Sequence, residues 1–520
     1  MSQSRTKRLT AIHGWSGTVL GILLYVVIVT GAIVVFDNEI RDWSQGSAQV
    51  ENGLSGKVDR IVRNAARGID PKFYEEVFVR PHVEGQMRVS FQSHQTNPDT
   101  GGLDDYVILL TLDKETGEEV SRKEGFSGEV FGADRGAALS RFLVDLHVQL
   151  YLPEPWGLYM TGILGLLMMA ASVTGFLMHK HLFRDAFLPA RPGERLVTAR
   201  DRHILAASWS LPFAIILAFT GAFFSFALSL AVPVLAMVAF GGDQQALVET
   251  VLGVPDELDL TRTSLASLDY IIADATSRVG GAPTLLQIDH YGSASAMVTS
   301  FHSPAPSDLT RQTLLFDGVT REYLGVKPTI GLAPSVGSSL VSLMGPLHFG
   351  NFAGLLSKTV WLALGLAMAY VTATGMLLWT KRREEERLWQ NFNRALTITI
   401  WGLPIAVLGS AYGFFFFLPA GDTVFWTPVA FAIATIVCIW VGFGKKDPTE
   451  RYIRWLGYMS VLLPLFRHIV GGLSWSEALI QGQMAVLTID ILLVIGGLVL
   501  LRPLRHAAPL IRRRHLEPAE

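Results

Sequence analysis

The stretch Ile12-His13-Gly14-Trp15-Ser16-Gly17 leads directly into an uncharged apolar segment that ends near Phe36 and contains the pair Thr30-Gly31. The arrangement returns later in the chain, where His203 precedes Thr220-Gly221 by the same 17 residues. Two further apolar segments each contain a Thr-Gly pair that follows a histidine at a longer spacing. They combine His147 with Thr174-Gly175 and His348 with Thr374-Gly375. Because histidines and small residues recur together, the sequence predicts an internal repeat within a membrane bundle.

The composition excludes an ordinary soluble protein. Of the 520 residues, 50% are hydrophobic and 17% are charged, and the mean hydropathy is +0.36. Several uncharged runs reach the roughly 20 residues that a helix needs to cross about 30 Å of hydrocarbon. The first run is too long for a signal peptide and lacks a cleavage site, so we expect an uncleaved anchor. The single cysteine, Cys438, excludes an internal disulfide and a cysteine-held metal cluster.

Charged flanks orient the chain. Arg5, Lys7 and Arg8 precede the first apolar segment, and basic residues dominate the loop 180–202. Basic flanks mark the cytoplasmic side, so we expect both termini inside. The sequence predicts eight spans, with residues 229–240 as an interfacial continuation. The spans lie at 15–36, 156–178, 204–228, 359–380, 396–418, 424–443, 453–472 and 483–501.

The segments between the predicted spans indicate two small α+β domains on the outer side, where acidic residues prevail. In each domain a helix-like stretch precedes alternating strands and a hairpin with an Asp-containing turn. The helix-like stretches are 58–67 and 265–279, and the turns are 113–117 and 317–321. We therefore divide the chain into a first span (1–36), outer domain 1 (37–145), spans two and three (146–228), outer domain 2 (229–347), span four (348–383) and a four-span extension (384–520).

The histidines suggest cofactor chemistry. A histidine at the end of a span often just sits in the interface, but here the topology places His13 with His203 at the inner face and His147 with His348 at the outer face. If the two halves are related by an axis along the membrane normal, each pair meets across that axis. Two facing imidazoles indicate a bis-His iron site. Without a Cys-x-x-Cys-His motif the haem would be b-type, so we expect two haem b groups.

Other residues receive secondary roles. The four Thr-Gly pairs either pack helices together or let a flat macrocycle approach the backbone. His179 is a reserve ligand for the inner haem, although its counterpart in the second half is Trp379, which favours an interfacial role. His468 is a candidate for a third site or a quinone contact.

The motifs together resemble those of PepSY-associated transmembrane proteins, a family that includes iron-regulated membrane proteins and ferric-siderophore reductases. The resemblance covers about residues 8–383. It rests on the four histidine motifs (8–17, 143–147, 202–203 and 345–350), the Thr-Gly pairs and the two hairpins. It implies two periplasmic PepSY domains on a haem bundle of the bacterial inner membrane that passes electrons outward. The extension departs from the family pattern, and the chain has no flavodoxin-like or nicotinamide-binding segment.

The sequence thus predicts a mainly α-helical, multi-pass di-haem b protein that reduces ferric siderophores or other ferric chelates. Its electron donor would be a cytoplasmic or membrane component, its surroundings the lipid bilayer, and nucleic acid is not an expected partner. Two alternatives stay open. One is a non-enzymatic PepSY protein acting in regulation or assembly, and the other is a transporter, for which the core spans offer little buried charge.

Overall fold

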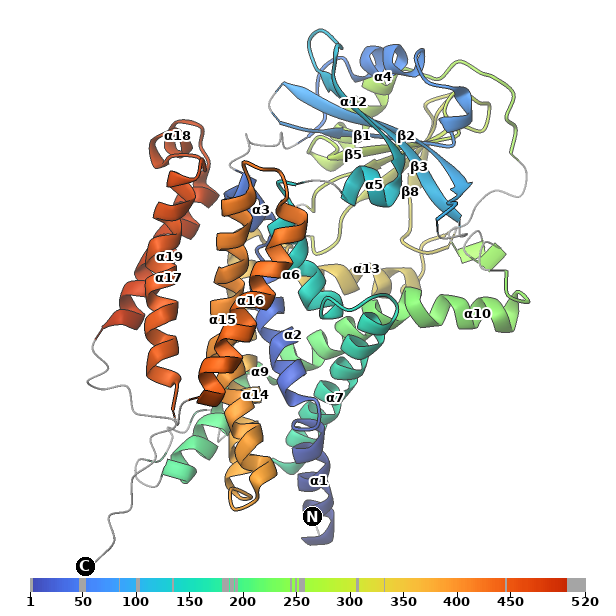
Figure 1. Cartoon of the computed structure of the whole chain (residues 1–520). Helices are drawn as coiled ribbons and strands as arrows, with labels where there is room; N and C mark the ends of the chain where they lie inside the picture. Colours follow the sequence, from blue (N-terminus) through green and yellow to red (C-terminus); the bar gives the residue numbers. More distant parts are fainter. Residues whose placement is uncertain are drawn as a thin grey trace, which may run out of the picture.

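The computed structural model describes residues 3–502, apart from 46–52, 84, 100–102, 133–134, 180–186, 188–190, 192–194, 244–245, 248–249, 252–257, 305–307, 332 and 445–446. Much of the basic loop expected at 180–202 therefore lies outside the described residues. A bundle of long helices carries a β-sheet domain at one end, and the N-terminus lies at the opposite end (Figure 1). This division matches the predicted mainly helical membrane fold with soluble domains on one side.

Four segments form the repeated core of the bundle. The first is a pair of helices, α1 (Gln3–Ser16) and α2 (Gly21–Val34), which meet at a bend of 64°. The others are α7 (Trp156–Met178), α9 (Arg195–Phe226) and α14 (Gly354–Lys381). The bend interrupts the single straight span that the sequence predicted at 15–36. It separates His13 on α1 from the Thr-Gly pair on α2.

The C-terminal extension adds α15 (Arg387–Phe417), α16 (Thr423–Gly444), α17 (Thr449–Ile469), the short α18 (Trp475–Ile480) and α19 (Met484–Leu501). Within the described residues, six helices are long and apolar enough to cross a membrane, or seven if α1 and α2 form one bent span. The predicted span that does not qualify is the seventh, at 453–472, which corresponds to α17. That helix is long enough, but charges such as Arg454 and Arg467 make it too polar to qualify by composition.

A buried polar cluster ties the extension to the first half. Arg467 Nη2 lies 2.7 Å from Asp490 Oδ2, and the two side chains are 0% and 2% exposed. The indole Nε1 groups of Trp43 and Trp475 donate to the same carboxylate at 2.8 and 2.9 Å. Trp43 belongs to α3 (Asp37–Gln45), which follows α2. Each charge is therefore paired and hydrogen-bonded, as burial requires.

Short helices lie between the bundle and the sheet. They are α6 (Ala138–Gln149), α13 (Val336–Phe349) and α10 (Val232–Ala239), the last joined to α9 by a π-helical turn at Ala227–Ala231. In Figure 1, α13 and α10 run across the bundle below the sheet. α10 exposes apolar side chains, with Met237 69% and Val238 80% exposed. Such a surface fits the interfacial segment predicted at 229–240.

The two outer domains share one antiparallel sheet of eight strands in the order β4-β3-β2-β1-β5-β6-β7-β8. Strands β1 and β5 join the halves, with Val77 opposite Ile288. The sequence predicted the strands but not this union. The strands are β1 (Glu76–Pro81), β2 (Gln86–Thr96), β3 (Leu103–Asp113), β4 (Glu119–Phe126), β5 (Leu285–Asp289), β6 (Met297–Phe301), β7 (Thr313–Asp317) and β8 (Tyr323–Val326).

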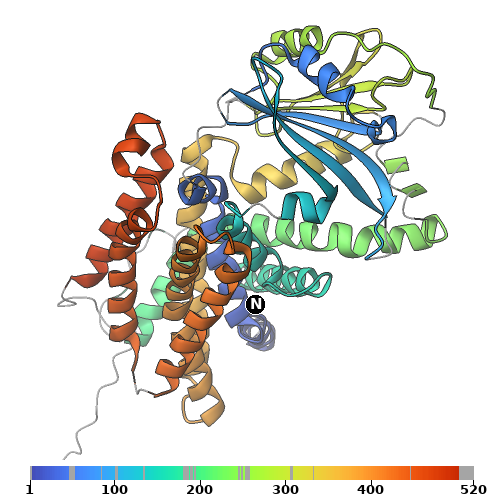
Figure 2. The ribbon, with the colours of Figure 1, turned by 45° about the horizontal axis from the view of Figure 1, so that its top comes forward.

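Helices α4 (Val58–Ala66) and α12 (Leu268–Val279) cover one face of the sheet (Figure 2). Their apolar stripes meet the inward side chains of the strands in a common core. The hairpins of the two halves use the same turn: backbone N–H groups two and three residues on donate to the Asp113 and Asp317 carboxylates. Hydrogen bonds from Thr116 and Glu115 hold the pKa of Asp113 below its ordinary value.

Candidate functional site

Four histidines from different helices form two facing pairs. His13 on α1 and His203 on α9 have ring centroids 6.5 Å apart, with an angle of 76° between the ring planes. His147 on α6 and His348 on α13 have centroids 6.1 Å apart and an angle of 30°. We call the first the sheet-distal pair and the second the sheet-proximal pair. Each pair unites one histidine from each half of the repeat.

Each imidazole is anchored through Nδ1. His13 Nδ1 lies 2.8 Å from the Ala171 carbonyl oxygen, and His147 Nδ1 lies 2.9 Å from that of Val27. A carbonyl can only accept, so both nitrogens must carry the proton and donate it. In the neutral ring, Nε2 then keeps its lone pair. Both histidines are therefore set to use Nε2 as a ligand.

Threonine hydroxyls give the other two histidines the same tautomer. His203 Nδ1 lies 3.1 Å from Thr374 Oγ1, and His348 Nδ1 lies 2.9 Å from Thr220 Oγ1. Each hydroxyl already donates to a carbonyl one turn earlier in its own helix, at 2.7 and 2.8 Å. It can accept but has no second proton to donate, so Nδ1 of the histidine is again the donor. All four rings thus present Nε2 as an acceptor.

The glycines of the four Thr-Gly pairs lie in close contact with these imidazole rings. A methyl group on Gly31 would lie 2.7 Å from His147 Cε1, and one on Gly221 would lie 3.3 Å from His348 Cε1. The corresponding distances are 3.2 Å from Gly175 to His13 and 3.2 Å from Gly375 to His203. Every glycine therefore contacts a histidine of another helix. The sequence predicted helix packing or close approach of a macrocycle. It did not reveal these glycine–histidine contacts, because they depend on how the helices cross.

A cavity of about 560 Å³ surrounds the sheet-distal pair. Both its histidines and their glycines, Gly175 and Gly375, line the wall, and the volume lies in the range of cofactor sites. His179, the reserve candidate, also lines this cavity.

His468 lies elsewhere, exposed on α17, while its neighbour Arg467 is the buried residue. The sequence carried a signal for the buried polar cluster around Asp490: two successive apolar runs contain opposite charges, Arg467 and Asp490.

The spacing within the pairs can be tested against a metal ion. Two metal–nitrogen bonds of about 2.0 Å, plus about 1.1 Å from each nitrogen to its ring centre, put the centroids about 6.2 Å apart. The observed centroid separations of 6.5 and 6.1 Å are close to this value. In the described part of the chain, no three His, Cys, Asp or Glu side chains gather to hold a metal. Among the described residues, each pair therefore brings two imidazoles together without a third residue of these types.

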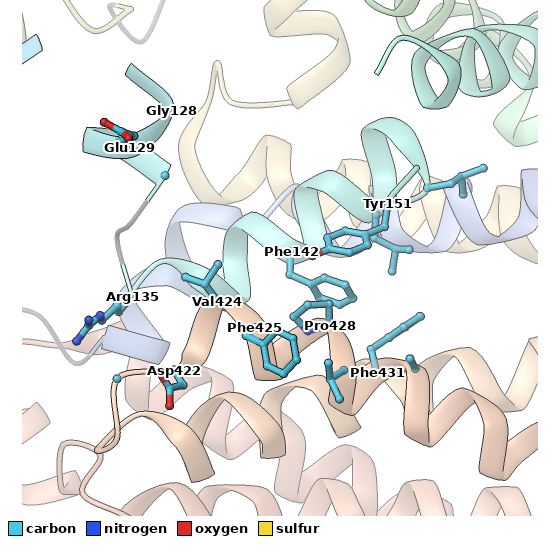
Figure 3. A pocket seen from close by; sticks show the side chains of 16 residues that line it. Gly128, Glu129, Arg135, Phe142, Tyr151, Asp422, Val424, Phe425, Pro428 and Phe431 are labelled. Atoms are coloured by element: carbon cyan, nitrogen blue, oxygen red, sulfur yellow. The ribbon is translucent and has the colours of Figure 1, made fainter. Parts of the chain in front are cut away.

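A second pocket, of about 1060 Å³, lies between α6 and α16. Figure 3 shows Phe142 and Tyr151 on one side of it and Phe425 and Phe431 on the other, with charged residues such as Arg135 toward one end. Leu146, the neighbour of His147, also lines the pocket. Helix α6 thus separates this pocket from the sheet-proximal pair. Sequence reasoning missed it because one wall belongs to the extension.

The fold and the paired histidines define a multi-pass membrane protein with a soluble β-sheet domain at one end of its bundle. The chain belongs to the family of the PepSY-associated TM region, whose sequence profile matches residues 10–382. The resemblance inferred from the motifs is thus confirmed. The chain is also similar to the uncharacterized protein PA4219 of Pseudomonas aeruginosa, with 23% identity over 387 residues, 69% of this chain and 93% of that protein. The matched family region ends before α15.

Proposed function

We propose that the chain is a di-haem b electron-transfer protein of the bacterial inner membrane that reduces ferric siderophores or other ferric chelates on the periplasmic side. The observation that carries this proposal is the double histidine pair, in which all four rings hydrogen-bond through Nδ1 and so keep the lone pair of Nε2. When bound, haem iron supplies one-electron chemistry between its ferric and ferrous states.

The protein's contribution is to hold and orient the ligands. Carbonyl and hydroxyl acceptors fix each imidazole tautomer, a device that also raises the basicity of a metal ligand. The glycines fix the ring positions by contact. The two pairs lie toward opposite ends of the bundle, since His13 and His203 belong to the helix ends away from the sheet (Figure 1). This separation suits electron transfer from a cytoplasmic or membrane donor toward the sheet side.

Ferric chelates suit the proposed acceptor role. One electron converts chelated Fe(III) to Fe(II), and hard oxygen chelators hold Fe(II) less tightly, so the metal is released. The large pocket between α6 and α16 is a suitable place for a chelate to dock, because a single helix separates it from His147. A helix is about 10 Å across, so the docked acceptor would lie within a short electron-transfer distance.

The test uses the purified full-length protein, reduced chemically under anaerobic conditions and freed of excess reductant. Addition of a hydroxamate ferric siderophore should re-oxidise the haem spectrum, with Fe(II) appearing in a ferrozine trap. The His348→Ala variant should lose most of this rate while its sheet-distal haem is still reducible. His468→Ala, an exposed histidine on α17, is the matched control and should keep the full rate. Ferric chelates that leave the reduced spectrum unchanged would exclude the iron-reductase assignment.

A further inference from the structure

The cavity at the sheet-distal pair is apolar at one end and polar at the other. Its deep end, toward the sheet, is lined by Leu24, Met168, Leu211 and Met368, which come from α2, α7, α9 and α14. Its mouth, away from the sheet, is lined by Thr6, Thr10, Arg200 and Arg382. All four core segments therefore line the cavity, whose wall is apolar at the deep end and carries charged side chains at the mouth.

Arg200 and Arg382 lie on the same helix sides as two residues of the sheet-distal site, His203 and Gly375. Arg200 lies three residues before His203 on α9, and Arg382, seven residues after Gly375, directly follows the last residue of α14. Both spacings return to the same side of a helix. Neither guanidinium forms an ion pair with a described residue, whereas the neighbouring Arg383 is stacked on the Trp379 ring at 3.8 Å. Arg200 and Arg382 are thus available to pair with an anionic group in this cavity.

A third polar group points to a ligand. Trp379 lines the same cavity, and its Nε1 is buried with no hydrogen-bond partner among the described residues. A buried indole N–H normally has a partner. At the mouth of this cavity, an acceptor belonging to a bound ligand would supply it.

We propose, on the basis of the proposed function, that this cavity fixes one orientation of its haem, with both carboxylates at the mouth on Arg200 and Arg382. Haem b is amphipathic: two carboxylates occupy one edge and apolar groups the opposite edge. Carboxylates placed against Leu24 and Met368 would be buried without partners, which is costly. At the mouth, arginine forks bind carboxylates well, and Trp379 Nε1 adds a donor.

The polar groups at the mouth come from one half of the internal repeat. The first-half counterpart of Arg200 is Thr10, 190 positions earlier, and that of Trp379 is His179, 200 positions earlier. Both arginines and the indole therefore come from the second half. The two cations, from α9 and α14, lie at the same end of the cavity and can pair with the two carboxylates on one edge of the macrocycle.

The experiment compares haem with its dimethyl ester, in which both carboxylates are methylated. A His147→Ala/His348→Ala background leaves the sheet-distal site alone, and the apoprotein is titrated by absorbance. The parent should bind haem about 10-fold more tightly than the ester, from two solvent-facing charge-assisted contacts. Adding Arg200→Gln and Arg382→Gln should abolish this preference and lower the midpoint potential, because a nearby cation favours the reduced state.

The control is Arg454→Gln, which changes an exposed arginine of α17 and should keep both the preference and the potential. Equal affinity of the parent for haem and ester would overturn the proposed orientation, and so would a preference that survives in the double glutamine variant. Failure of the parent to bind either compound would instead overturn the haem assignment itself. Both arginines are exposed, and unchanged thermal unfolding of the apoproteins would exclude misfolding as the cause.

Discussion

The close contact between Gly31 and the His147 ring gives the most sensitive mutational test of the proposed haem site. A Cβ at residue 31 would lie 2.7 Å from His147 Cε1 and 3.1 Å from Nδ1, whereas ordinary contact begins near 3.4 Å. In Gly31→Ala the ring must therefore retreat by about 0.7 Å. It cannot retreat freely, because its Nδ1 is held at 2.9 Å by the Val27 carbonyl on the same helix as Gly31. Ligand positions must be kept within about 0.5 Å.

We expect Gly31→Ala to weaken haem binding at the sheet-proximal pair by about 2 kcal/mol, or roughly thirty-fold, a typical cost of overpacking. The purified variant should then carry close to half the wild-type haem. At the other three glycines an added Cβ would lie 3.2 to 3.3 Å from the histidine Cε1. Gly175→Ala, Gly221→Ala and Gly375→Ala should therefore each lose much less haem. Gly496→Ala, where a Cβ meets nothing within 4 Å, is the control.

The assay is haem per protein by the pyridine haemochrome method, with reduced-minus-oxidised spectra to identify the remaining group. Full haem content and an unchanged spectrum in Gly31→Ala would refute the proposed position of the His147 ring. A larger loss in Gly221→Ala than in Gly31→Ala would refute the steric argument even if both variants lose haem.

His348, the buried Arg467–Asp490 pair and the topology each give a further test. His348→Ala should remove the sheet-proximal haem and leave the other spectrally intact; a variant that retains both would remove this residue from the ligand set. Asp490→Leu should destabilise the protein by about 3–5 kcal/mol, because it leaves a buried guanidinium unpaired, and adding Arg467→Met should restore most of the thermal stability; equal melting of the two variants would contradict this. Reporter fusions in the hairpin at Thr116 should be active only as periplasmic reporters, and fusions at Glu385 only as cytoplasmic ones; a cytoplasmic signal at Thr116 would reverse the topology.

The elements that the sequence predicted well are those with strong local patterns. The second span was predicted at 156–178, and α7 has these bounds, because an uninterrupted apolar run of membrane length has few alternatives. The strands and the two Asp turns were predicted because alternation and turn chemistry are local. The placement of two histidines at each end of the bundle followed from basic flanks and an internal repeat.

The features that the sequence could not reveal depend on contacts between distant segments. The join between β1 and β5 links strands about 200 positions apart, and no local signal specifies it. The bend between α1 and α2 lies at residues 17–20, which contain no proline. The seating of each histidine on a glycine of another helix depends on the helix crossings. The pocket between α6 and α16 appears only once the extension packs against the first half.

The proposed function depends on four histidines that hold two haem groups. It is tested most directly by quantifying haem in the full-length protein, purified in detergent from haem-supplemented cells, together with its absorption spectrum. We expect two haem b per chain, both low-spin with two imidazole ligands. A colourless protein that also fails to bind added haem would contradict it, and would favour a non-enzymatic role in regulation or assembly, or transport, for this member of the family.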